Sequence, residues 1–153
     1  MATILDIADA LVDELNVATF SPPYDRPLGA VRSYATRYSP EQLERLRVTV
    51  LPAGYAPELS ARGAASGDFQ VAVAVQRRTD WTEENQRHGQ LDELVNLCEE
   101  IVGFCLGLEG LAGGASCTAC EVSFPYDTDL LRDDGTFTGV LIATFKAQVE
   151  VRP

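Results

Sequence analysis

The sequence has almost no lysine or histidine: Lys146 and His88 are the only residues of these two types among 153. The 12 basic residues face 23 acidic residues, and the resulting net charge of −11 disfavours a general nucleic-acid-binding function because it repels phosphate backbones. The remaining basic residues are all arginines. That bias fits a GC-rich genome, and it also fits a protein interface, where the planar guanidinium pairs with carboxylates.

The presence of only one histidine also limits the catalytic mechanisms that need a histidine base. His88 lies in a polar turn at residues 86–89, where we expect it to be solvated, and no G-x-S-x-G sequence supplies a nucleophile, so nothing here argues for a Ser-His-Asp arrangement. Adjacent acids such as Glu99 and Glu100 point to different sides of a helix, which does not favour an acid–base pair. We therefore predict no enzymatic activity and no catalytic residue. A small cytoplasmic enzyme or ligand-binding module stays the alternative from a different class.

Cofactor and metal motifs are equally scarce. Cys117 and Cys120 form the only C-x-x-C, whereas a zinc site usually needs a second such pair or two histidines. The glycines of residues 107–114 are not followed by Lys-Ser/Thr, so they do not form a phosphate loop, and Arg132 stands where a calcium loop needs glycine. We expect no cofactor and reduced structural thiols; whether Cys117 and Cys120 bind a metal stays open.

No apolar run approaches the roughly 20 residues that cross a bilayer. The first six residues carry an acid and no basic region, which is not typical of a signal peptide, so we expect synthesis in a cytoplasm and no membrane partner. A hydrophobic fraction of 46% is ordinary for a folded protein. We predict one domain over residues 1–153.

The strongest local pattern lies at residues 68–106. Large apolar residues alternate with small or polar ones, which predicts a strand with one buried face. Asp80, with Glu83 three places on, predicts the start of a long helix, and apolar residues at helical spacing from Leu91 to Cys105 predict its buried stripe. The alternating apolar residues are Phe69, Val71, Val73 and Val75.

The remaining elements complete the predicted fold. Thr3 and Asp6 predict the start of a first helix, which ends near Asn16. Residues 39–46 predict one or two helical turns. Alternating patterns predict further strands at residues 31–38, 48–51, 120–124 and 137–151. This order indicates an α+β domain, with a mostly antiparallel sheet on which the N-terminal helix and one long helix pack.

Two long inter-strand loops are expected, at residues 53–67 and 126–135. A connection of about 15 residues is unusual in a compact domain without a function. The first is either a mobile surface loop or an arm that contacts a neighbour, and its contact groups would be Tyr55, Leu59 and Arg62. In the second, Leu130 and Leu131 beside Arg132 either form an apolar anchor with a charged rim or pack onto their own sheet.

Taken together, these landmarks resemble the tail-terminator or tail-completion proteins of long-tailed (siphovirus-type) bacteriophages. The likeness covers nearly the whole chain in short pieces and includes no catalytic motif. The glycine run and the C-x-x-C are not part of it. The residues that carry it are 7–11, 38–40, 46–52, 62–63, 68–71, 91–94, 125–127, 130 and 137–145.

The resemblance implies a structural virion protein at the tail–neck junction. Such proteins form a hexameric ring that caps the tail tube and joins it to the neck or head connector. The implied partners are therefore further copies of the chain, the tube protein and the connector. A neck or head-completion (stopper) protein of the same junction is the alternative. DNA would pass through the ring without specific binding, and an acidic helix face would keep it from adhering. The acids concerned are Asp92, Glu93, Glu99 and Glu100.

Overall fold

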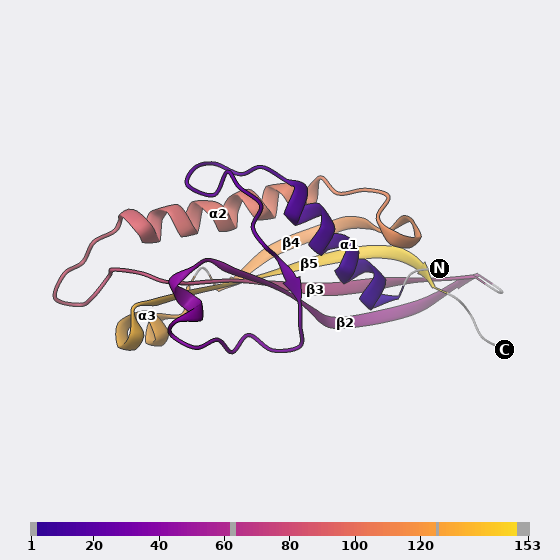
Figure 1. Ribbon diagram of the computed structural model, residues 1–153. Helices are drawn as coiled ribbons and strands as arrows, with labels where there is room; N and C mark the ends of the chain where they lie inside the picture. The colour runs from indigo at the N-terminus through magenta and orange to yellow at the C-terminus, as the bar shows by residue number, and fades with distance from the viewer. Residues whose placement is uncertain (1–2, 62–63, 125, 150–153) are drawn as a thin grey trace.

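The computed structural model describes residues 3–61, 64–124 and 126–149. They form an α+β fold with a five-stranded sheet in the order β1-β2-β3-β5-β4 (Figure 1). Only the short β1, Val31–Arg32, runs parallel to its neighbour; every other pairing is antiparallel. The two longer helices, α1 and α2, lie on the same face of this sheet (Figure 1). The predicted fold class is confirmed.

Helix α1 spans Ile4–Val17 and begins as the sequence predicts. The Thr3 hydroxyl accepts a hydrogen bond from the Asp6 amide at 3.2 Å, and the Asp6 carboxylate accepts one from the Thr3 amide at 3.1 Å, so two free amide groups of the first turn are satisfied. Its apolar stripe packs on β2 and β3. The fully buried residues of this stripe are Ile7, Ala8, Leu11 and Leu15.

Strands β2, Arg47–Ala61, and β3, Ala64–Arg78, form one long hairpin. Its inner half carries the predicted alternation: Val71, Val73 and Val75 are fully buried under the helices. Its outer half corrects the expectation of a loop at residues 53–67, because residues 54–59, 61 and 64–67 of that segment are paired strand rather than irregular chain. The pairing is irregular at two places in this hairpin, between Pro52 and Gly54 and between Leu59 and Ala61.

Helix α2 spans Gly89–Leu106, so its predicted start at Asp80 is wrong. The polar residues at 80–85 form a turn instead of a helix start. In this turn the Thr82 hydroxyl accepts a hydrogen bond from the Asn85 amide at 2.9 Å. No apolar residue between Trp81 and Leu91 gives this segment a face to bury, so a helix there would gain nothing from packing. Gly107 ends the helix as predicted. None of the described helices combines the length and apolar character needed to cross a membrane.

The C-terminal half supplies β4, Ser116–Phe124, and β5, Thr136–Val149. β5 lies between β3 and β4, and its buried side chains alternate along the strand. Between them, the second predicted loop contains a short helix, α3, Thr128–Asp134. Asp127 caps it by accepting hydrogen bonds from two backbone amides, and Gly135 ends it with a positive φ of 67°. This capping accounts for the helix at residues 128–134 of the predicted loop.

The predicted strand at residues 31–38 is mostly absent, because only Val31 and Arg32 pair with β2. The chain then crosses to the face of the sheet opposite α1 and α2. There the short 3-10 helix η1, Gln42–Glu44, packs on β3, and the Tyr38 hydroxyl bonds the buried Thr49 hydroxyl at 2.6 Å. A second 3-10 turn, η2, Ala112–Gly114, connects α2 to β4.

Candidate interaction surfaces

The outer half of the β2–β3 hairpin forms an arm, here defined as residues 54–61 with 64–69. Tyr55 is 62% exposed and stacks on the buried Phe69, with ring centroids 5.9 Å apart. Leu59 lies on the same side of the strand and is 66% exposed. Two predicted contact groups are therefore both exposed on one side of the strand, while Arg62 lies outside the described residues. Nothing in the described chain covers this surface.

Both outer edges of the sheet are open in the part of the chain that the structure describes. On β2, β1 pairs only with Thr49 and Val50, so the edge of the arm has no strand partner. On β4, the opposite edge is contacted only by the Leu108 carbonyl, which accepts from the Cys117 amide at 3.0 Å. Each open edge presents free amide and carbonyl groups that can pair with another strand.

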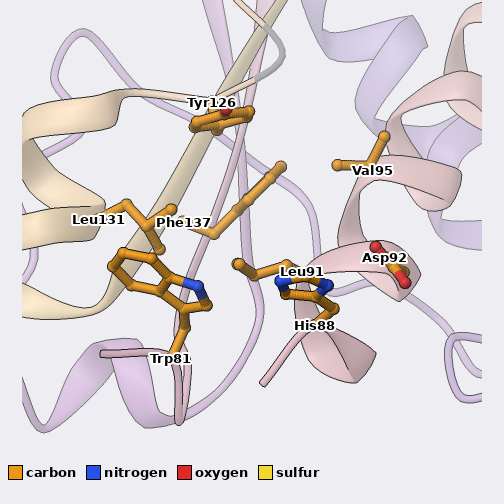
Figure 2. A pocket seen from close by; sticks show the side chains of 8 residues that line it. All are labelled: Trp81, His88, Leu91, Asp92, Val95, Tyr126, Leu131 and Phe137. Atoms are coloured by element: carbon orange, nitrogen blue, oxygen red, sulfur yellow. The ribbon is translucent and has the colours of Figure 1, made fainter. Parts of the chain in front are cut away.

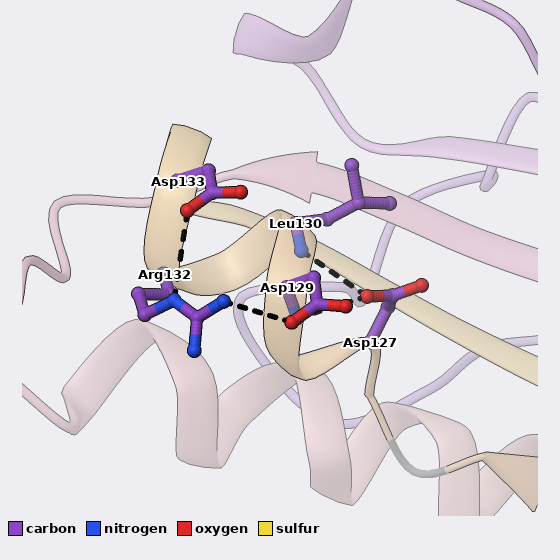
Figure 3. Close-up of polar contacts among 5 residues, drawn as sticks. All are labelled: Asp127, Asp129, Leu130, Arg132 and Asp133. Carbon is purple, nitrogen blue, oxygen red and sulfur yellow. Dashed lines mark hydrogen bonds and ion pairs between the residues drawn. The ribbon is translucent and has the colours of Figure 1, made fainter.

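At α3, the three predicted contact residues, Leu130, Leu131 and Arg132, have different surroundings. Leu131 is buried against its own sheet, which is the alternative to an anchor, whereas Leu130 is 37% exposed. Arg132 is held by acids of its own helix, at 2.9 Å from Asp129 and 3.6 Å from Asp133 (Figure 3). Of this predicted trio, only Leu130 presents a free apolar side chain.

A shallow hollow of about 290 Å³ lies between α3 and the start of α2 (Figure 2). Most of its lining is apolar or aromatic, and its only ionisable groups besides Tyr126 are His88 and Asp92. Among the described residues, no serine, cysteine or threonine lines it beside His88, so these residues form no nucleophile–base pair there. The lining residues are Trp81, His88, Leu91, Asp92, Val95, Tyr126, Leu131 and Phe137.

A larger hollow of about 770 Å³ lies on the face opposite α1 and α2, between the residues around η1 and α3. Its floor contains Gln76 and Thr138, which face each other across β3 and β5. Gln76 is only 6% exposed, yet its Oε1 and the Thr138 hydroxyl have no hydrogen-bond partner among the described residues. Arg37 and Arg78 line the same hollow together with Asp127, Asp133 and Asp134. Buried polar atoms without partners are uncommon, which makes this a candidate ligand site.

The acidic face of α2 is brought together only in part. Glu93, Glu99 and Glu100 line one shallow hollow of about 430 Å³, whereas Asp92 lies at the other hollow beside His88. Glu100 is also held in place, because its carboxylate accepts a hydrogen bond from the Ser21 hydroxyl at 2.6 Å. The helix has no basic residue to neutralise these acids.

Three of the four thiols gather where the last turn of α2 meets β4. Cys105 is fully buried there, and Cys117 and Cys120 pack against the core from β4. Cys98 lies seven residues before Cys105, and burial raises the pKa of its thiol to about 12. The sequence indicated structural thiols but not this grouping, because the bulge that aligns Cys117 with Cys120 has no sequence signature. All four cysteines are free.

The sequence also gave no signal for the hollow containing Gln76 and Thr138, since it forms only when three distant segments meet. No group of three or more histidine, cysteine or acidic residues in the described part of the chain is arranged to hold a metal ion. Comparison of the sequence with protein-family models and with curated proteins finds no match.

Proposed function

We propose that this chain is a structural virion protein, a tail terminator that assembles with further copies of itself into a ring on the end of a tail tube. The observation that carries the proposal is the pair of open edges on one antiparallel sheet. The two edge strands, β2 and β4, run in opposite directions, because β3 and β5 between them alternate. A copy rotated about an axis parallel to the strands can therefore place its β4 antiparallel to β2 of its neighbour.

Such a contact is head-to-tail, and a head-to-tail contact closes into a ring when the rotation divides a full turn. A hexameric ring is what the resemblance implies. Part of the β2 edge is occupied by β1, so the free portion is the arm. Pairing there would add main-chain hydrogen bonds and cover the apolar surface of Tyr55 and Leu59, both of which are exposed in the isolated chain.

A ring of this kind has one sheet face toward its channel and the other outward. We infer that the side carrying α2 faces the channel, because its exposed acids would repel passing DNA. Glu93 and Glu99 are the best candidates, since both are exposed and Glu100 is engaged by Ser21. Replacing both by lysine should slow genome ejection from assembled particles, and unchanged ejection from intact particles would contradict the inference.

The test of assembly compares three chains by native mass spectrometry and electron microscopy over a wide concentration range. The wild-type chain should form closed rings, alone or on tail tubes. Leu59→Lys should abolish them, because it places a charge on the arm. Val17→Lys is the matched control, since Val17 is 79% exposed at the end of α1 and far along the chain from the arm. Loss of rings in both variants, or in neither, would contradict the role of the arm.

A neck or head-completion protein would use the same surfaces, and the partner that binds the ring separates these two alternatives. Detection of the chain in purified particles tests both, because a component of the junction must be present there. Recovery of the chain at the tail end of tubes lacking heads favours the terminator.

The hollow containing Gln76 favours a second candidate, a ligand-binding module. Its unpartnered amide oxygen and the Thr138 hydroxyl would bind the donor groups of a small polar ligand. A ligand that binds only the folded chain raises its thermal stability. A small-molecule screen should then yield a stabilising compound whose effect is lost in Thr138→Val; absence of any stabiliser that depends on Thr138 would rule this candidate out.

A further inference from the structure

A β-bulge sets the direction of the two thiols on β4. Cys117 pairs with Phe145 and Cys120 with Ala143, although only one residue separates these two partners on β5. Thr118 is therefore the extra residue of the bulge. Without it, residues three apart on a strand would point to opposite faces. Because Phe145 and Ala143 are both buried on the face that α2 covers, both thiols are turned toward α2.

The third thiol approaches from the helix. Cys105 lies in the last turn of α2 and is fully buried. The chain just beyond it is fastened to β4, since the Leu108 carbonyl accepts a hydrogen bond from the Cys117 amide at 3.0 Å. Cys105 meets Cys120 across the contact between α2 and β4, and the interaction of these two thiols is the largest cause of the pKa shift of each. Cys117 is engaged elsewhere, because its thiol donates to the Ala119 carbonyl at 3.3 Å.

From this arrangement we propose that Cys105 and Cys120 form a reactive dithiol that closes into an intramolecular disulfide by exchange with a small-molecule disulfide. Cys120 is the attacking residue, since it is partly exposed, and Cys105 is the resolving residue, since it is buried against it. The inference does not depend on ring assembly.

The exchange proceeds in two balanced steps, shown here for oxidised glutathione. The Cys120 thiolate attacks one sulfur of the reagent, which forms a mixed disulfide and releases one glutathione thiolate. The Cys105 sulfur, after losing its proton to solvent, attacks the Cys120 sulfur and releases the second glutathione thiolate. The two released thiolates take up the two protons that the protein thiols have lost. Two protein thiols are oxidised and one glutathione disulfide is reduced.

The protonation of the pair supports this division of roles. The interaction with Cys105 lowers the pKa of Cys120, and the same interaction, together with burial, raises the pKa of Cys105. Because the thiolate is the nucleophile, the thiol with the lowered pKa reacts first. The pKa of Cys117 is raised, chiefly by burial, which leaves it less reactive than Cys120.

The test treats the reduced full-length chain with oxidised glutathione under native conditions and maps its disulfides by non-reducing peptide mass spectrometry. The expected product has lost two hydrogen atoms and contains a Cys105–Cys120 bond. Cys105→Ala should instead retain glutathione on Cys120, because the resolving thiol is missing. Cys117→Ser and Cys98→Ala are the controls, and both should form the same bond at the wild-type rate.

Three results would overturn the proposal: glutathione that remains on wild-type Cys120, a Cys117–Cys120 bond as the main product, or no reaction of the native chain under conditions where the unfolded chain reacts. If Cys105→Ala does not fold, the wild-type map and the Cys117→Ser variant decide the question by themselves.

Discussion

The inner and outer halves of the β2–β3 hairpin share the same two strands but differ in what covers them. In the inner half, Val48 and Val50 are 1% and 0% exposed under α1. In the outer half, the arm, Tyr55 and Leu59 are more than half exposed. The two strands nevertheless remain paired there, and Figure 1 shows them side by side beyond the helices. Backbone pairing therefore continues where burial stops.

This difference indicates that the inner half stabilises the domain and that the arm offers a surface for a partner. The helices cover the apolar side chains of the inner half and remove their surface from water. Burial of this kind is the main stabilising contribution in a domain of this size. The arm leaves aromatic and aliphatic side chains in water, and exposed apolar groups on an unpaired edge are typical of contact surfaces. The predictions below test this contrast.

The largest expected effect comes from the covered half. Leu11→Ala removes a fully buried side chain of α1 and should lower the free energy of unfolding by about 2–5 kcal/mol, because it leaves a cavity. Leu59→Ala on the arm should change it by less than about 0.5 kcal/mol, as for most exposed positions. Denaturant titration followed by circular dichroism measures both. Equal losses would mean that the arm packs on its own domain.

A smaller loss in the free energy of unfolding is expected for a substitution within the arm, Gly67→Ala. A Cβ at Gly67 would stand 2.9 Å from Cγ2 of Val149 and 3.5 Å from the Cα of Pro57, so Gly67→Ala should cost about 1–3 kcal/mol. Hydrogen exchange should show faster exchange of arm amides and unchanged protection of the inner half.

The control for this change is Gly103→Ala, also a glycine-to-alanine change but on the exposed side of α2, where no atom lies within 4 Å of the added Cβ. It should stabilise the chain by roughly 0.5–1 kcal/mol through helix propensity. Uniform loss of protection in Gly67→Ala would show instead that arm and inner half unfold together.

The smallest predicted effect is on the pH dependence of stability, and it comes from Cys98 on the covered side of the sheet. Burial raises the pKa of Cys98 from 9.0 to about 12, so the folded chain holds this proton more tightly than the unfolded chain. Its contribution to stability is therefore complete below pH 9 and is lost as the pH rises toward 12. Between about pH 8 and about pH 10, the wild-type chain should lose roughly 1 kcal/mol more than Cys98→Ala. Equal losses would show that Cys98 ionises freely in the folded chain.

The same contrast explains how far the sequence predicts the fold. Where apolar residues recur with one period, as in α1, inner β3 and β5, tertiary packing agrees with the local pattern and the predictions are confirmed. The arm was missed because Gly54 and Pro57 read as loop residues, and only pairing with β3 makes them strand. The cap signal at Asp80 failed for the opposite reason, since no apolar stripe followed it.

The candidate surfaces divide in a similar way. Tyr55 and Leu59 are brought together by a strand that the sequence did not predict, and their role as contacts stays a prediction. Leu131 is buried because α3 forms, which depends on the cap at Asp127 and the positive φ of Gly135. The gathering of Cys105, Cys117 and Cys120 depends on a bulge and a helix–strand contact, and no local spacing in the sequence predicts either.

Cross-linking of the two sheet edges tests the central claim most directly. A chain with Glu58→Cys on the arm and Glu121→Cys on β4, in which Cys117 and Cys120 are serine, is oxidised at high concentration and analysed by non-reducing electrophoresis and native mass spectrometry. Joining of β2 to β4 of neighbouring copies predicts a ladder of covalent oligomers that ends at one closed size, only when both cysteines are present. Dimers formed by the Glu58→Cys change alone, or no cross-linking at all, would contradict it.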